Sequence, residues 1–155
     1  MASQNPEDAP KCPGFEHGEH TSDVLVRAWG RTLEEAFEWA AIGAYEVITN
    51  TDKVTPRVRV EIRSTGIDEY SLLYNFIEDL LYYTDTQGLV FSKLIRVCKI
   101  DKNDDGASLL AYAWGERFDP NKHEHRTIIK AMTYAQMSIT SRDDGCWEVT
   151  FVPDI

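Results

Sequence analysis

The alternation of apolar and polar positions along the chain predicts strands interrupted by two helices. Residues 24–29 read VLVRAW, which is rich in strand-forming side chains, and Gly30 ends this run. Thr32 stands three residues before Glu35, a spacing typical of a capping box, in which each side chain satisfies a backbone N–H of the other residue. Apolar positions then recur every three or four residues, which predicts an amphipathic helix. They are Leu33, Ala36, Phe37, Ala40, Ala41, Ala44, Val47 and Ile48.

A second strand and a second helix follow the same reasoning. Residues 57–64 alternate between apolar and charged side chains, which predicts a half-exposed strand. Its inward side chains would be Val58, Val60 and Ile62. After Gly66, an amphipathic helix is predicted from about residue 70 to residue 83. Its inward positions are Leu72, Leu73, Phe76, Ile77, Leu80 and Leu81.

Beyond the second helix only strand patterns remain. They cover residues 89–100, 107–116, 127–140 and 146–152, and Gly- and Asp-rich connections indicate hairpins between some of them. The order is β-α-β-α-β-β-β-β. We therefore expect an α+β fold, a single compact domain with a largely antiparallel sheet and two helices packed on it.

The length of 155 residues and the 43% hydrophobic content fit one globular domain. Residues 1–18 are acidic, contain several prolines and have no apolar run, so they are predicted to form a flexible tail. The folded domain is then expected to span residues 19–155. No stretch is apolar enough to cross a membrane, and we expect a soluble protein with no membrane partner.

The net charge of −10 changes the expected partners, because a polyanion such as RNA would be repelled unless the charge were very unevenly distributed. We therefore expect no strong direct binding of nucleic acid, whereas a basic protein would be attracted. The three cysteines, Cys12, Cys98 and Cys146, include no CxxC pair. They predict small buried thiols in a reducing compartment.

Two metal motifs are weak. Residues 101–106, DKNDDG, match the opening of an EF-hand loop, but the twelfth position is Tyr112 and the flanks are strand-like, which favours a hairpin turn. Cys12, His17 and His20 are zinc-type ligands without a paired spacing, so we do not expect a zinc site.

Two basic features remain open at the level of sequence. Residues 121–126, NKHEHR, form either a solvated loop or a cluster in which Lys122 and the histidines bind phosphate or transfer protons. Lys130 lies in a predicted strand. It is either an exposed edge lysine or a buried one that requires a carboxylate partner.

The chain terminus suggests an oxygen-ligand site. Asp154 and the terminal carboxylate of Ile155 follow an apolar strand directly. If that last strand lies beside residues 24–29, Asp23 would meet these two groups, and together they would suit calcium or magnesium. The sequence does not by itself establish this adjacency.

A set of short motifs resembles the archease family over residues 19–155. They are Glu19-His20-Thr21-Ser22-Asp23-Val24, Ala28-Trp29-Gly30, Thr32-Leu33-Glu34-Glu35-Ala36-Phe37, Trp114-Gly115-Glu116, Lys122-His123, Ile129-Lys130-Ala131, Thr133-Tyr134 and Asp154-Ile155. The sequence departs from the family at Glu19, where many members have Asp, and at Ala135, where many have His. No role is assigned to either position.

The resemblance implies a non-catalytic activator of RtcB-type RNA ligases, which join tRNA halves during tRNA splicing. It implies that the protein promotes guanylylation of the ligase and multiple turnover. Independently of the resemblance, the cysteine usage leads us to expect a location in the cytoplasm, the nucleus or both, and we expect a monomer. It also implies a divalent metal, calcium first and magnesium or manganese as alternatives. The implied ligands are Asp23, Asp154 and Ile155. The implied contacts to the ligase or its nucleotide are His20, Lys122 and Lys130.

Two other classes remain as alternatives. One is a small metal-dependent hydrolase or nucleotidyl enzyme that uses Asp23 and Asp154 as ligands and His20 or His123 as a base. The other is a calcium-binding interaction module with no link to RNA, which would show metal-linked stabilisation without affecting a ligase.

Overall fold

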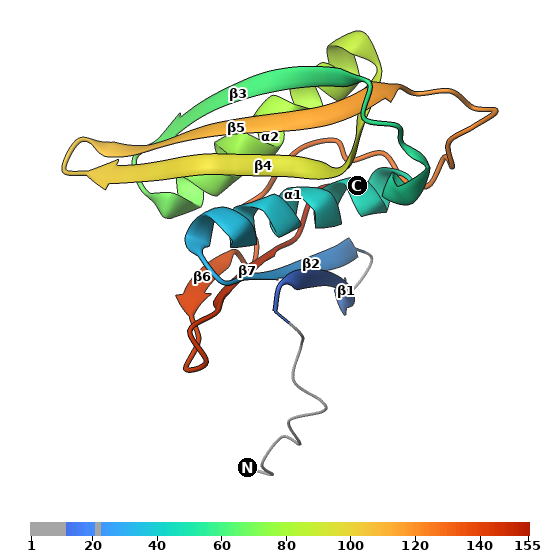
Figure 1. Ribbon diagram of the computed structural model, residues 1–155. Coiled ribbons are helices and arrows are strands. Elements are labelled where there is room, and N and C mark those ends of the chain that lie inside the picture. The colour runs from blue at the N-terminus through green and yellow to red at the C-terminus, as the bar shows by residue number, and fades with distance from the viewer. Residues whose placement is uncertain (1–11, 21–22) are drawn as a thin grey trace.

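The structure, a computed structural model, describes residues 12–20 and 23–155 and consists of two antiparallel sheets and two helices (Figure 1). The four-stranded sheet has the order β1 (Gly14–His20), β2 (Asp23–Gly30), β7 (Trp147–Phe151) and β6 (Ser138–Ser141). The three-stranded sheet has the order β3 (Val58–Gly66), β5 (Gly106–Arg117) and β4 (Leu89–Asn103). The helices are α1 (Leu33–Ile48) and α2 (Glu69–Gln87), with a short 3-10 turn η2 (Thr51–Lys53). The predicted α+β class is confirmed.

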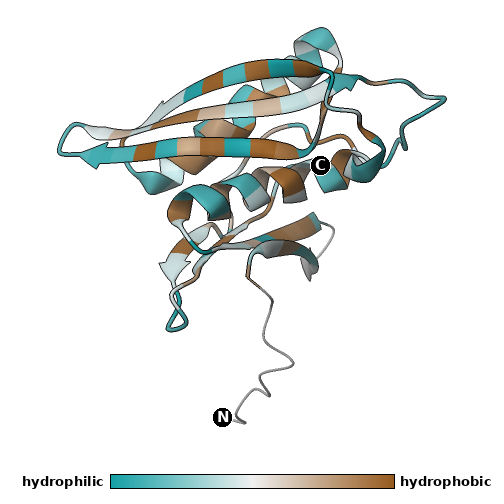
Figure 2. Cartoon of the chain, in the orientation of Figure 1, coloured by the Kyte–Doolittle hydropathy of each residue, from teal (hydrophilic) through white to brown (hydrophobic). Residues whose placement is uncertain are grey.

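Helix α1 lies between the two sheets, where it packs on β2 of one sheet and β4 of the other (Figure 1). Helix α2 covers one face of the three-stranded sheet. In Figure 2, β3 and β4 alternate between hydrophilic and hydrophobic residues, as expected for strands with one face on a core. The sequence predicted a single sheet, whereas α1 separates two.

The start of α1 confirms half of the predicted capping box. The Thr32 hydroxyl accepts a hydrogen bond from the backbone N–H of Glu35 at 3.1 Å. The Glu35 carboxylate, however, accepts from the backbone N–H of Arg31 at 2.9 Å, and it also pairs with the Arg31 guanidinium. The predicted hydrogen bond from the backbone N–H of Thr32 to the Glu35 carboxylate is therefore wrong, because the ion pair with Arg31 holds Glu35 at the preceding residue.

Replacing Thr32 with alanine is expected to destabilise the domain by about 1 kcal/mol, because one backbone N–H of the first turn loses its acceptor. Urea denaturation of Thr32→Ala measures this loss. Thr140→Ala, an exposed position in β6, is the matched control and should unfold like the wild type. Equal midpoints for the two variants would contradict the capping role.

Helix α2 and strand β3 largely follow their predictions. The six apolar positions predicted to face inward from α2 are all buried. The helix begins after Asp68, which forms a capping box with Ser71, and ends at Gly88 in the left-handed region (φ 68°). In β3, Val60 and Ile62 are buried, but Val58 is 45% exposed. Val58 lies opposite Gly115, which has no side chain to pack against it, so the inward prediction is wrong there.

Two boundaries differ from the prediction. Strand β1 begins at Gly14 and pairs with β2, so residues 14–18 belong to the domain rather than to a tail that ends at residue 18. Of the strand predicted over residues 127–140, only β6 forms. The remainder has one isolated bridge, between Ala131 and Asp154, because its backbone groups bond to separate partners instead of one ladder.

The connection between β4 and β5 is the predicted hairpin turn. Asn103 pairs with Gly106, and residues 104–105 form the tip, so the EF-hand alternative has no helical flanks. None of the described helices is both long enough and apolar enough to span a bilayer.

The cysteines do not behave as predicted. Cys12 and Cys146 form a disulfide with their Cα atoms 6.5 Å apart, and Cys98 is exposed. The expectation of three small buried thiols is therefore wrong, since two distant positions are brought together by the β1–β2–β7 sheet. The thiol-based argument for a reducing compartment no longer applies, and Cys12 is not available as a zinc ligand.

Candidate functional site

Strand pairing brings the start of β2 and the end of the chain together. Strands β2 and β7 are antiparallel, and their ladder ends with Val26 opposite Phe151. Asp23 and Asp154 each lie three residues beyond that pair, at the same end of the sheet. The sequence could not establish that residues 24–29 lie beside the last strand, and the pairing of β2 with β7 shows that they do.

Lys130 joins this end of the sheet through the backbone. Its N–H donates to the carbonyl of Asp154 at 2.7 Å, and the N–H of Asp154 donates to the carbonyl of Ala131 at 2.9 Å. Lys130 is exposed, so the alternative of a buried lysine is excluded. The structure therefore places Lys130 beside Asp154. His20 ends β1 opposite Asp23, and its side chain lies outside the described part of the structure.

The chain end is held firmly, which fixes where these groups lie. Val152 and Pro153 are buried, and the carbonyl of Val152 accepts a hydrogen bond from the Thr133 hydroxyl at 2.7 Å. Ile155 packs partly against the core, whereas Asp154 is exposed. A carboxylate is thus presented to solvent from an anchored backbone, the arrangement that a ligand site needs.

The donor chemistry at this end fits a hard cation. The carboxylates of Asp23 and Asp154 and the terminal carboxylate of Ile155 supply only oxygen, which calcium and magnesium prefer. Within residues 12–20 and 23–155, no three His, Cys, Asp or Glu side chains are grouped closely enough to hold a metal.

Lys122 lies in a separate cluster around Glu116. Its amine contacts Oε2 of Glu116 and the hydroxyl of Thr55, both at 2.6 Å. Glu116 is buried at the end of β5 and also accepts from the backbone N–H of Thr55 at 2.8 Å and from Arg57 at 3.1 Å. His123 completes the set, with Nε2 at 2.9 Å from Glu116.

The electrostatics of this cluster are set by Glu116. Burial raises the pKa of its carboxyl, but hydrogen bonds from Lys122, Thr55, His123 and Arg57 outweigh burial and lower the pKa from 4.5 to about 2. Glu116 is therefore ionised and serves as the common acceptor. The sequence motif Trp114-Gly115-Glu116 contained this residue, but its partners lie in other segments, so no role was predicted for it.

His123 is a structural residue in this arrangement. It is buried, and its Nδ1 accepts the backbone N–H of Asp119 at 2.9 Å, which leaves the proton on Nε2 facing Glu116. Both ring nitrogens are therefore used inside the protein. The suggestion that His123 acts as a catalytic base loses its geometric support.

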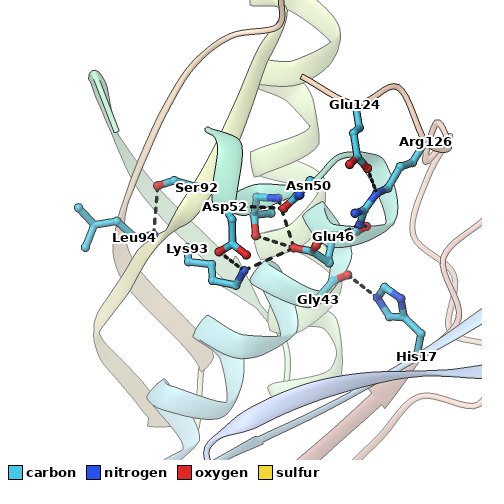
Figure 3. A network of polar contacts seen from close by, with 11 residues as sticks. His17, Gly43, Glu46, Asn50, Asp52, Ser92, Lys93, Leu94, Glu124 and Arg126 are labelled. Carbon is cyan, nitrogen blue, oxygen red and sulfur yellow. Dashed lines mark hydrogen bonds and ion pairs between the residues drawn. The ribbon is translucent and has the colours of Figure 1, made fainter. Parts of the chain in front are cut away.

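A second polar network anchors the same loop to the end of α1 (Figure 3). Arg126 donates to the Glu46 carbonyl at 2.8 Å, to the Glu46 carboxylate at 3.0 Å and to Glu124 at 2.7 Å. Because the last turn of α1 has no basic residue of its own, Arg126 supplies the positive charge that a helix end favours. The loop of residues 121–126 is thus largely structural rather than freely solvated.

His17 makes a separate contact to α1. Its imidazole bonds to the Gly43 carbonyl at 2.9 Å (Figure 3), so it holds β1 on α1.

Comparison with known proteins defines the class. The model of the Archease protein family matches residues 15–155. Protein archease of Aeropyrum pernix is 61% identical over 145 residues, which cover 94% of this chain and 99% of that protein. Protein archease of Pyrococcus furiosus is 45% identical over 141 residues, which cover 91% and 98%. The solution structure of Methanobacterium thermoautotrophicum protein 1598 has a TM-score of 0.78 and 36% identity, and covers 92% of this chain and 99% of that one.

The chain is thus an archease-like α+β domain over nearly its whole length. It belongs to the archease family. The match begins at residue 15, close to the start of β1, which agrees with the corrected domain boundary.

Proposed function

We propose that this protein is a non-catalytic cofactor that activates an RtcB-type RNA ligase in tRNA splicing. The observation that carries the proposal is membership of the archease family over residues 15–155, with 61% identity to a protein archease. In this role the protein promotes transfer of GMP from GTP to the ligase and returns the ligase to further turnovers. The acidic balance of the chain suits docking on a basic enzyme.

The working end of the molecule in this proposal is the one where β2 begins and the chain ends. Asp23, Asp154 and Ile155 would hold the divalent metal, with calcium first and magnesium or manganese as alternatives. A cation there would supply positive charge for placing the phosphates of a nucleotide or for ordering the ligase's own metal site. The pairing of β2 with β7 supports this grouping.

The contact residues of the proposal differ in how well they are placed. Lys130 is bonded through its backbone to Asp154 and is exposed, so its amine is available to a phosphate or to the ligase beside the proposed metal. His20 precedes the same end of β2. Lys122 is already paired with Glu116, so we assign it a secondary contact. Its side chain is 37% exposed, and the ligase would share the amine with Glu116.

Calcium is expected to stabilise the wild-type protein against thermal unfolding, because a ligand that binds only the native state raises its stability by about 2.7 kcal/mol at a hundredfold excess over Kd. Asp154→Asn should lose most of this calcium-dependent stabilisation. Asp104→Asn, at the exposed tip of the β4–β5 hairpin, should keep it. The same calcium shift in all three proteins would place the metal elsewhere.

The ligase role itself is tested by following guanylylation. A cognate RtcB-type ligase is incubated with labelled GTP, and the ligase-bound GMP is measured with and without this protein. Faster formation of the adduct supports the activator role. GTP consumption by the isolated protein would instead favour the metal-dependent hydrolase, and a calcium shift without any effect on the ligase would favour the interaction module.

A further inference from the structure

The outer face of the three-stranded sheet combines aromatic and basic side chains in register. Helix α2 covers the opposite face, and no described helix or strand packs on the outer one (Figure 1). The outer side chains of the central strand β5 include Leu110, Tyr112 and Trp114, which are all partly exposed. Their cross-strand partners are Arg63 and Lys99 beside Leu110, Glu61 and Arg96 beside Tyr112, and Arg59 beside Trp114.

The aromatic groups form a stacking surface that includes an arginine. The rings of Tyr112 and Trp114 lie 6.2 Å apart between centroids. The guanidinium of Arg59 lies over the Tyr112 ring, 4.9 Å from its centroid. Nucleobases stack both on aromatic rings and on guanidinium planes, so this group presents more than one such position.

A hollow lies further along the same sheet, around Leu110 of β5. It has a volume of about 340 Å³, and its lining includes Arg63, Lys99, Asp101, Ser108 and Leu110. The side chains of Arg63 and Lys99 are 71% and 67% exposed, so their charged groups are accessible to solvent. The apolar side chains, cations and hydroxyls of this lining suit a base and its adjoining phosphate, although the Asp101 carboxylate lies among them.

The charge of this face departs from that of the whole chain. The strands of this face carry four basic side chains, Arg59, Arg63, Arg96 and Lys99, against two acidic ones, Glu61 and Asp101, on a protein of net charge −10. Arg96 also interacts with Glu35 and Glu38 of α1. The acidic groups pair with Arg63 at 3.0 Å and Lys99 at 3.1 Å, in exposed positions. Exposed ion pairs contribute little, so a phosphate can replace the carboxylate at small cost. This is the uneven distribution that nucleic-acid binding by an acidic protein requires.

We propose that this face binds single-stranded RNA, with bases stacked on Tyr112, Trp114 and Arg59 and phosphates paired with Arg63, Lys99 and Arg96. The proposal extends beyond ligase activation, which requires no RNA contact by this protein. Single strands are favoured over duplex because stacking on a sheet face needs unpaired bases.

Fluorescence anisotropy with a labelled single-stranded oligoribonucleotide of about ten nucleotides, a length within the range of comparable single-strand sites, tests the proposal without any ligase present. We expect saturable binding that weakens about tenfold in Tyr112→Ala, the usual cost of one lost stacking partner. Tyr112→Phe keeps the ring and should bind like the wild type. Tyr82→Ala, which removes a 60% exposed tyrosine from α2, is the matched control and should also bind normally. Arg63→Ala should weaken binding and reduce its dependence on salt, since one phosphate contact is lost.

Three results would overturn the proposal. They are no anisotropy change at about 100 µM protein, equal binding by Tyr112→Ala and the wild type, and equal losses in Tyr82→Ala and Tyr112→Ala. If Tyr112→Ala instead impairs ligase activation while RNA binding is unchanged or absent, the face is a protein-docking surface. Cooperative thermal melting of each variant shows that a loss of binding does not come from unfolding.

Discussion

Asp23→Asn and Asp154→Asn are each expected to remove most of the stimulation of an RtcB-type ligase while leaving the domain folded. Each change removes one anionic oxygen donor from the end of the molecule where β2 begins and the chain ends. Asp154 is exposed, and loss of its charge leaves its backbone bonds to Lys130 and Ala131 in place. The ligation rate with either variant should fall at least about tenfold toward that of the ligase alone, in line with what perturbing a metal site costs.

The control for these variants is Asp104→Asn, which removes the same charge at the tip of the β4–β5 hairpin. It should stimulate the ligase like the wild type. Thermal melting of all three variants checks that the fold is kept. Full stimulation by Asp23→Asn and Asp154→Asn would show that the proposed metal end plays no part in activation.

Glu116→Ala is expected to destabilise the protein by about 3 kcal/mol, more than the loss of the Thr32 cap. The buried carboxylate accepts hydrogen bonds from Thr55, Arg57, Lys122 and His123. Its removal leaves the buried Nε2–H of His123 and the N–H of Thr55 without an acceptor, which costs more than a surface contact. Urea denaturation measures the change. Glu61→Gln, which removes an exposed carboxylate paired with Arg63, should unfold near the wild type.

The contribution of Glu116 also depends on pH. Because the folded protein lowers the pKa of this carboxyl from 4.5 to about 2, its stabilising effect is fully present above about pH 4.5 and is lost as the pH falls toward 2. The stability difference between the wild type and Glu116→Gln should therefore shrink over that interval. A difference that stays constant from pH 6 to about pH 2 would contradict the role of the ionised carboxylate.

The helices were predictable because their determinants are local. The apolar spacing and the Thr32 cap lie within one segment, and the structure confirms both. Strand β1 was missed because GFEHGEH has a single large apolar residue, and its pairing with β2 decides its conformation. Residues 127–137 carried apolar side chains in strand-like positions, but Ile129 and Met132 are buried from an extended segment without a ladder.

In the candidate site, too, the residue types could be predicted from the sequence, whereas the contacts between distant segments could not. The oxygen donors at Asp23 and at the chain end could be recognised from residue types. Their proximity, however, depends on the β2–β7 pairing, which joins residues more than a hundred positions apart in the sequence. Glu116 gains its role from Thr55 and Arg57, which come from another segment. The disulfide between Cys12 and Cys146 is non-local as well, and no spacing rule indicates it.

Multiple-turnover RNA ligation shows whether this protein is a recycling activator of an RtcB-type ligase. A cognate RtcB-type ligase is given GTP, metal and RNA ends, and this protein is added well below the ligase concentration. We predict many ligation events for each molecule of this protein, because it dissociates from the ligase after each activation and acts again. Ligation that is unaffected, or that rises only to one event for each added molecule, would contradict a recycling activator.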